Sequence, residues 1–260
     1  MEKVKFVAYA ITTENYPTQI GPVPFEHTFV VSDRGDNWHC WGRGKEMIGN
    51  GARQLPPDGT ALAQWGDLIN GTDPDHPTGL TMRVSGVCHH AANRILVLAG
   101  TDVSQANGDL FATLVYGKYG YEIEAFVANV KATAAQLNAS EPGAVTEAAL
   151  QEVLGRIADD PSDEMKLLES HFRAALPDTI GPQQNAQLMV AYKTFQAKRQ
   201  AIYDQEPNKN DPNFQSRFGQ ELEPAFMECL MSFTEVLGVD GYKEVFKSKP
   251  EDVIGQLLKL

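Results

Sequence analysis

Residues 25–42 read FEHTFVVSDRGDNWHCWG, two largely apolar stretches on either side of a short polar turn. The turn, residues 33–35 (DRG), has three residues with glycine last, which is the arrangement of a type I turn followed by a bulge. Glycine suits the left-handed position of such a turn because it carries no Cβ. The stretch therefore predicts a β-hairpin in which Phe29 lies opposite His39.

Two histidines belong to this hairpin. His27 lies two positions before Phe29 and shares its face of the strand, so His27 and His39 are diagonal neighbours across the two strands. The Cα atoms of such neighbours are about 7–8 Å apart. Two imidazoles at that distance can hydrogen-bond, one acting as a base and the other orienting it.

A second informative stretch is SGVCHHAANRIL, residues 85–96. Ser85 is a good N-cap, and the alanines and leucine that follow favour a helix over about residues 86–98. Cys88 then lies in the first turn, where unpaired N–H groups and the helix dipole favour a thiolate. The same N–H groups can receive an oxyanion. We therefore expect Cys88 to be a nucleophile, with a buried, inert cysteine as the alternative.

A thiolate nucleophile needs a base, and the contexts of the six histidines narrow the choice. His89 and His90 follow Cys88 directly and point away from it, because neighbours one and two positions apart do not share a helix face. Two further histidines lie in a polar loop and on a helical surface. His27 and His39 remain as the candidates.

This order of residues is similar to that of the circularly permuted papain-like enzymes. That group includes permuted NlpC-type hydrolases and lecithin:retinol acyltransferase-like enzymes. The shared features are a histidine on a strand, a second histidine twelve positions later across a hairpin, and a later cysteine that opens a helix. The resemblance covers about residues 1–120. It implies that His27 is the general base, His39 the residue that orients it, and Cys88 the nucleophile on a helix packed against a small antiparallel sheet.

Other residues complete the predicted site. Asp33 or Asp36, at the hairpin turn, could replace His39 as the orienting group. Three tryptophans are candidates for an apolar wall beside the substrate, although core packing explains them equally well: Trp38, Trp41 and Trp65. We expect no cofactor and no metal.

The chain changes character near residues 118–122. The part before this point is rich in strands and loops. Residues 4–9 alternate in the manner of a strand with apolar residues on both faces, and a Gly- and Pro-rich stretch over 49–79 holds one short helix near 61–69. The part after it shows apolar residues three and four positions apart, which predicts amphipathic helices at 122–137, 145–158, 163–176, 183–204 and 214–237. We therefore predict an α+β protein: a papain-like catalytic core over 1–120 and an all-helical region over 121–260, which serves as a lid or a substrate-binding extension.

Three further details concern the helical pattern. Residues 110–116 fit either a strand or the start of the helical part. Pro224 falls inside the last amphipathic pattern and should kink that helix or start it anew, because proline lacks the N–H that the helix needs. Residues 207–212 (PNKNDP) predict a loop between the last two helices.

Charge and composition exclude several kinds of partner. The 260 residues carry a net charge of −12, so the surface repels phosphates, and we expect neither a nucleic-acid partner nor an anionic membrane surface. No run of eighteen apolar residues predicts a membrane span, and no signal peptide is recognised. Three widely spaced cysteines fit reduced thiols. We expect a cytoplasmic protein, or one exported without a classical signal peptide.

The expected function is a thiol-dependent hydrolase that acts on an amide or peptide bond, or an acyltransferase, through an acyl-enzyme thioester. Its partner is then a peptide or acyl substrate. A non-catalytic helical binding protein, with Cys88 as a core residue, is the alternative. A metal-stabilised module, with ligands from residues 39–40 and 88–90, is a third possibility, but these positions lack the paired spacing that zinc sites usually have.

Overall fold

The computed structural model describes residues 2–12, 25–38, 44–73, 76–158, 180–246 and 248–250. The chain divides into two compact units, Met1–Asp159 and Asp160–Leu260. The first unit therefore extends well past the boundary that we expected near residues 118–122. It includes the first two of the predicted amphipathic helices, so the region 121–260 is not one helical body.

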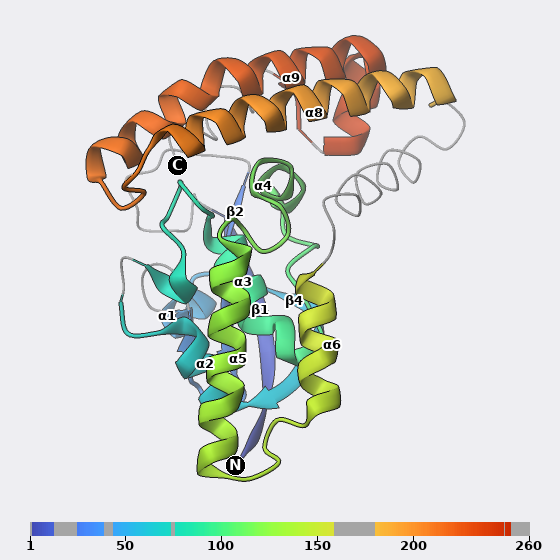
Figure 1. The fold of residues 1–260 in the computed structure, drawn as a ribbon. Coiled ribbons are helices and arrows are strands. Elements are labelled where there is room, and N and C mark those ends of the chain that lie inside the picture. The colour runs from blue at the N-terminus through green and yellow to red at the C-terminus, as the bar shows by residue number, and fades with distance from the viewer. Residues whose placement is uncertain are drawn as a thin grey trace. The chain divides into compact units, whose positions relative to one another are not determined.

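The first unit is built on a four-stranded antiparallel sheet (Figure 1). Its strands lie in the order β3-β2-β1-β4. Their bounds are β1, Lys3–Thr12; β2, Glu26–Ser32; β3, Asn37–Trp38; and β4, Arg53–Leu62. The predicted first strand is confirmed: Val4, Phe6 and Ala8 are buried, with exposed or half-buried residues between them. Together with the helices that follow, the sheet confirms the α+β class.

The hairpin has the register that the turn predicts. The N–H of Ser32 donates to the carbonyl of Asp36 at 2.8 Å, and Gly35 has a φ of +93°. Val30 pairs with Trp38, which continues the same register. The described part of the second strand ends there, because residues 39–43 lie outside the described ranges.

Strand β4 corrects the prediction for residues 49–79, where we expected loop and one short helix. It is an edge strand, and its register against β1 shifts between Phe6 and Ala8, next to Pro56 and Pro57. Edge strands and bulges are the settings in which sheets tolerate proline. Gly59 then meets a short 3₁₀ turn, η3 (Val97–Ala99): a Cβ at this position would lie 2.1 Å from the carbonyl oxygen of Ala99.

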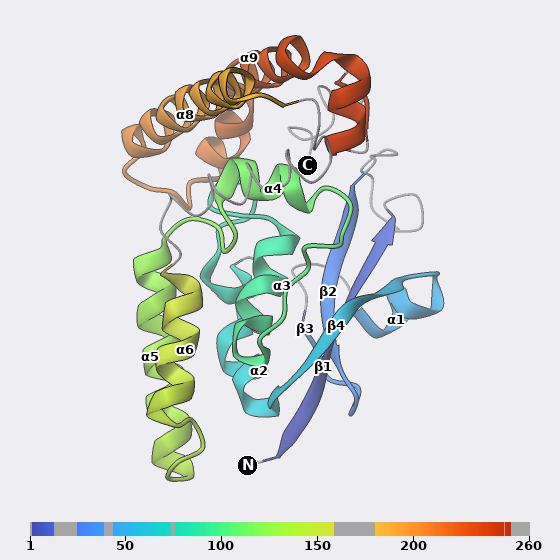
Figure 2. The ribbon, with the colours of Figure 1, turned by 90° about the vertical axis from the view of Figure 1, so that its right-hand side faces the viewer.

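Helices cover both faces of the sheet in the first unit (Figure 2). On one face lie α2 (Ala63–Asn70) and α3 (Cys88–Leu96), with α5 (Ile123–Ser140) and α6 (Glu147–Ile157) packed outside them and η3. On the other face lies α1 (Gly44–Gly49). The 3₁₀ turn η2 (Pro77–Gly79) precedes α3, and α4 (Asp109–Tyr116) follows it, so residues 110–116 are helical rather than extended.

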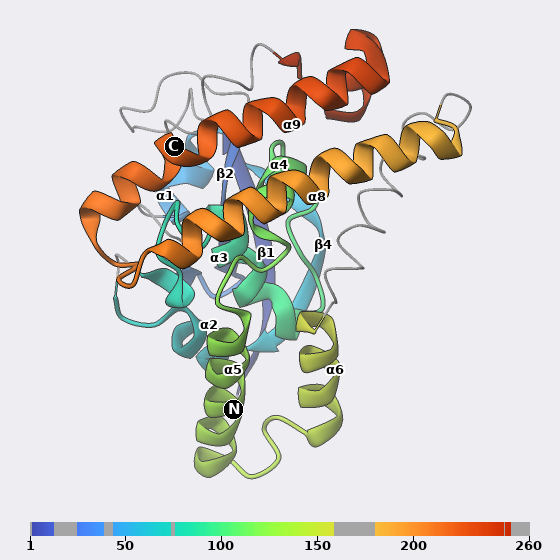
Figure 3. The same ribbon diagram turned by 45° about the horizontal axis from the view of Figure 1, so that its top comes forward.

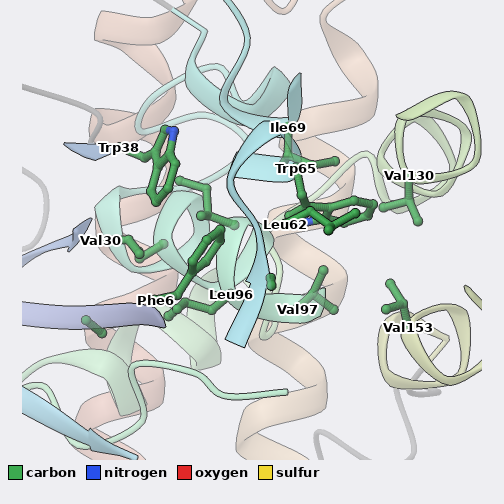
Figure 4. Packing of buried hydrophobic residues seen from close by; sticks show 14 of the residues in the cluster. Phe6, Val30, Trp38, Leu62, Trp65, Ile69, Leu96, Val97, Val130 and Val153 are labelled. Atoms are coloured by element: carbon green, nitrogen blue, oxygen red, sulfur yellow. The ribbon is translucent and has the colours of Figure 1, made fainter. Parts of the chain in front are cut away.

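The main core lies between the sheet and these helices (Figure 4). Trp65 has no exposed surface and Trp38 is 3% exposed, and both belong to this core. The Trp38 ring packs against Phe6 with ring centroids 4.7 Å apart, and its Nε1–H donates to Asp67 at 3.0 Å. These two tryptophans are therefore core residues and not a wall beside a substrate. Trp41 lies outside the described residues.

The second unit contains a hairpin of two long helices, α8 (Pro182–Gln205) and α9 (Pro212–Phe246) (Figure 3). The predicted loop between them is confirmed. The helix continues through Pro224, and the break that we expected there lies instead at Gly238, which has a φ of +69°. The predicted helix at 163–176 lies outside the described residues. Among the residues described, no helix has both the length and the apolar character to cross a bilayer.

Candidate active site at the start of helix α3

Cys88 lies in the first turn of helix α3, as the sequence predicts, but the helix begins at Cys88 itself, two positions later than expected, and its cap differs. The N-cap is Val87 and not Ser85. The Ser85 hydroxyl accepts the N–H of Thr81 at 2.8 Å inside the preceding turn. The N–H of Val87 donates to Nδ1 of His90 at 2.8 Å, so an imidazole satisfies the helix start in place of a serine hydroxyl.

Cys88 is partly exposed and packs against Leu80 and Ala91. Cys229, in α9, is buried, and burial raises the pKa of its thiol to about 12. A thiol with so high a pKa is almost entirely protonated near neutral pH and is a poor nucleophile. Of the two described cysteines, Cys88 is therefore the one that a reagent or a substrate can reach.

His90 is unsuited to act as the base for Cys88. It is fully buried, and burial, with a smaller effect of neighbouring His89, lowers the pKa of His90 to about 3. Its Nδ1 is already occupied by the N–H of Val87, and its ring stands edge-on to Tyr116 with centroids 5.3 Å apart. So weak a base stays neutral near pH 7 and holds the helix start in place.

His89 joins the start of α3 to the start of β2. Its Nε2 lies 2.8 Å from the backbone carbonyl oxygen of Glu26. A carbonyl oxygen can only accept, so Nε2 carries the hydrogen and donates it. The residue after Cys88 is thereby bonded to the residue before His27.

Glu26 is itself held firmly. Its buried carboxylate receives two N–H groups of Arg53 at 2.8 and 2.5 Å, and the backbone N–H of Asn107 at 2.8 Å. Burial opposes ionisation of Glu26, but these donors outweigh it and leave its pKa below the usual value. The start of β2, to which His89 is bonded, is therefore fixed between β4 and the segment that precedes α4.

His27 is buried on β2, and its ring stacks on Phe29 with centroids 6.1 Å apart. Strand alternation places it on the face of Phe29, which packs with α1, whereas Val30 points to the face that α3 covers. A contact between His27 and Cys88 must therefore form around the end of β2, where α3 begins. The structure brings the two elements together at this end, and the pairing of the two side chains stays a prediction.

The alternatives for the orienting residue can also be placed. Asp33 accepts the N–H of Lys5, and Asp36 accepts the hydroxyl of Ser32. Both aspartates lie at the opposite end of β2 from His27, about 20 Å away at the rise of a strand. This distance excludes them as the group that orients His27. His39 lies outside the described residues, so its role stays a prediction.

Sequence reasoning missed Asp109, the first residue of α4. Its Oδ1 faces Nδ1 of His89 at 3.9 Å, and burial raises its pKa to about 6. Asp109 is the only charged residue in an otherwise apolar helix that reads DLFATLVY. An isolated acid in such a helix was the available signal, because buried carboxylates rarely occur without a purpose.

Metal ligands do not gather in the described part of the chain. There, no group of three or more His, Cys, Asp and Glu side chains is placed to hold an ion. The module with ligands from residues 39–40 and 88–90 stays untested, because residues 39–40 lie outside the described ranges.

The second unit has a concave surface of its own. A groove of about 540 Å³ lies between α8 and α9. Its lining mixes apolar side chains, such as Val190 and Phe195, with charged ones, such as Lys198 and Glu228. Cys229 also lines it, but with the inert thiol described above. The groove therefore offers a binding surface without evident chemistry.

The structure thus sets Cys88 at a helix start that is bonded to the strand carrying His27. Comparisons with protein-family models, with curated proteins and with solved structures found no match.

Proposed function

We propose that the chain is a thiol-dependent hydrolase of amide or peptide bonds, with Cys88 as nucleophile and His27 as general base. The observation that carries this proposal is the bond from His89 to the Glu26 carbonyl, because it holds the start of α3 against the start of β2. A partly exposed thiol at a helix start supports this proposal, because thiol catalysis needs an accessible sulfur near N–H groups that can hold an oxyanion.

The chemistry proceeds in two halves. His27 takes the proton of the Cys88 thiol, and Sγ attacks the carbonyl carbon of the substrate. N–H groups at the start of α3 stabilise the oxyanion. The C–N bond then breaks, and the departing amine takes the proton from His27, which leaves a thioester. Water gives a proton to His27 and attacks the thioester, and the acid leaves as Cys88 regains its proton. An acyltransferase differs only in that another acceptor replaces water.

The first experiment measures thiol reactivity. Brief treatment of the folded chain with iodoacetamide near pH 6, followed by peptide mass mapping, should label Cys88 at least about tenfold faster than Cys229. Cys229 is a matched internal control, because it is buried in the same chain with a raised pKa. Equal labelling of both thiols, or no labelling of Cys88, would contradict an activated nucleophile.

The second experiment tests the pairing with the base. Intact-mass screening against peptide and activated ester libraries should trap an acyl adduct on Cys88. His27→Ala and Cys88→Ala should each abolish turnover, and the double variant should be hardly worse, because residues that act as one unit are strongly non-additive. Losses that multiply would show that the two side chains act independently.

The alternative function, a non-catalytic binding protein, is favoured by the groove between α8 and α9, beside which Val190 is 64% exposed. It predicts that Cys88 stays unlabelled and that no acyl adduct forms.

A further inference from the structure

A buried histidine and a buried aspartate face each other beside the candidate nucleophile. Nδ1 of His89 and Oδ1 of Asp109 are 3.9 Å apart, and neither atom has a hydrogen-bond partner among the described residues. His89 is 3% exposed and Asp109 is 9% exposed, so bulk water does not readily hydrogen-bond to either atom. Because Nε2 of His89 already donates to Glu26, the neutral ring presents only a lone pair at Nδ1.

An ionised Asp109 also presents only lone pairs. Two buried acceptors that face each other repel, and each lacks the partner that offsets its removal from water. A single proton between them removes the conflict. It makes either an imidazolium beside a carboxylate or a carboxylic acid that faces a neutral imidazole, and the gap of 3.9 Å closes by about 1 Å as either pair forms its hydrogen bond.

We propose that His89 and Asp109 share one proton across this gap, and that this proton fixes the start of α3, and with it Cys88, against β2. The two residues are then positioning residues for the thiol. The catalytic meaning of this pair rests on the proposed function, whereas the shared proton itself does not.

With the proton in place, His89 is bonded at both ring nitrogens, to the carbonyl of Glu26 and to Asp109. Burial raises the pKa of Asp109 to about 6, so Asp109 holds a proton below about pH 6 and loses it above. When this proton is lost, the lone pairs of His89 Nδ1 and of the Asp109 carboxylate repel each other, and the start of α3 is held less firmly. The start of α3 is therefore more ordered in mild acid and becomes less ordered as the pH rises.

Other ionisable groups interact with the pair from each neighbouring element, and they are Cys88 and His90 on α3, Asp102 before α4, Lys118 after α4, and Glu26 on β2, which is itself paired with Arg53 on β4. Asp102 strengthens the hold on the proton and Lys118 weakens it, but these two are paired with each other at 2.9 Å. A thiolate at Cys88 also strengthens the hold on the proton. Ionised Cys88 and the protonated pair therefore stabilise each other.

The first test reads the proton directly. The ¹⁵N shifts of the His89 ring, followed by NMR from pH 4.5 to 8, should show a step in the wild-type chain as Asp109, with its pKa of about 6, loses its proton. Asp109→Asn keeps the shape and donates an amide N–H to Nδ1 at every pH, so this step should disappear. Identical titrations of His89 in the wild type and in Asp109→Asn would overturn the shared proton.

The second test reads the position of the helix start. The amide of Ala91 donates to the carbonyl of Val87 in the first turn of α3, and its hydrogen-exchange protection reports opening of that turn. In the wild type this protection should fall by up to about tenfold per pH unit between about pH 4 and pH 6, where opening releases the proton of Asp109, and should level off above pH 6. It should stay constant in Asp109→Asn. The matched control Asp102→Asn removes a neighbouring carboxylate and should keep the step.

These outcomes separate the inference from the proposed function. A step that is absent, or that Asp102→Asn abolishes as fully as Asp109→Asn does, overturns the pair as a positioning device. So does an iodoacetamide reactivity of Cys88 that has the same pH dependence in the wild type and in Asp109→Asn. A Cys88 that never reacts, beside a pair that titrates as described, overturns the proposed function alone.

Discussion

Arg94 is the residue of α3 whose replacement tests most directly how the helix is anchored. Its side chain is fully buried and donates to three backbone carbonyls: Tyr119 at 2.8 Å, Thr78 at 3.0 Å and Tyr121 at 2.5 Å. Its guanidinium also lies over the Phe126 ring, 4.5 Å from the centroid. One side chain thus ties α3 to η2 and to the segment that precedes α5.

Opposing contributions decide the effect of Arg94→Met. Three buried carbonyls that lose their donor cost about 1–3 kcal/mol each, and the lost contact with Phe126 adds about 1–2 kcal/mol. Against this, burial lowers the pKa of Arg94 from 12.5 to about 9, which corresponds to about 5 kcal/mol of penalty on the buried charge that methionine removes. We expect a net loss of about 2–3 kcal/mol in the free energy of unfolding.

Arg94→Lys is the control that separates geometry from charge. Lysine keeps the penalty of a buried charge, but its single ammonium cannot reach three carbonyls arranged around a fork. We expect it to destabilise the first unit by about 3–5 kcal/mol, more than methionine does. Urea unfolding followed by tryptophan fluorescence measures this unit alone, because all three tryptophans, at positions 38, 41 and 65, belong to it. A lysine variant more stable than the methionine variant would refute the reasoning.

Two further predictions concern stability. Gly59→Ala should destabilise the first unit by about 2–3 kcal/mol in the same urea assay, because its Cβ would meet the carbonyl of Ala99, whereas Gly155→Ala, in a helix with open space, should stabilise by up to about 1 kcal/mol. Because the pKa of Asp109 is raised on folding, its contribution to stability is present below about pH 4 and is lost as the pH rises through 6, for a total of about 3 kcal/mol. Urea midpoints from pH 4 to 7.5 should show this fall in the wild type and not in Asp109→Asn; equal slopes would contradict it.

Local patterns predicted the parts of the fold that local rules control. Alternation located β1, the DRG turn set the hairpin register, and helical spacing located α5, α6, α8 and α9. Strand β4 was missed because its two prolines and Gly59 are residues typical of loops. A strand tolerates the prolines here because β4 is an edge strand with a register shift, and Gly59 is needed because η3 packs closely against it. The N-cap was wrong for a related reason: an imidazole three positions after Val87 supplies the acceptor that we assigned to Ser85.

For the site, too, the sequence predicted local features and missed contacts between distant residues. The place of Cys88 in the first turn of a helix was predictable from its neighbours in the sequence. The rule that adjacent helical residues face away from each other set His89 and His90 aside, yet both hold the helix start, through contacts that lie outside the helix face of Cys88. The distance from His89 to Asp109 spans twenty positions and a change of element, so no local pattern indicates it.

The contacts of Glu26 also determine when this region can be assembled. They join residue 26 to partners 27, 63 and 81 positions further along the chain, at Arg53, His89 and Asn107. Contacts between residues so far apart in the sequence close large loops. They form late in folding, because the chain loses the entropy of the open loop before the contacts stabilise it. A chain still emerging from the ribosome cannot complete this arrangement until residue 107 has been synthesised. Until then, the start of α3, with Cys88 on it, cannot be fully fixed against β2.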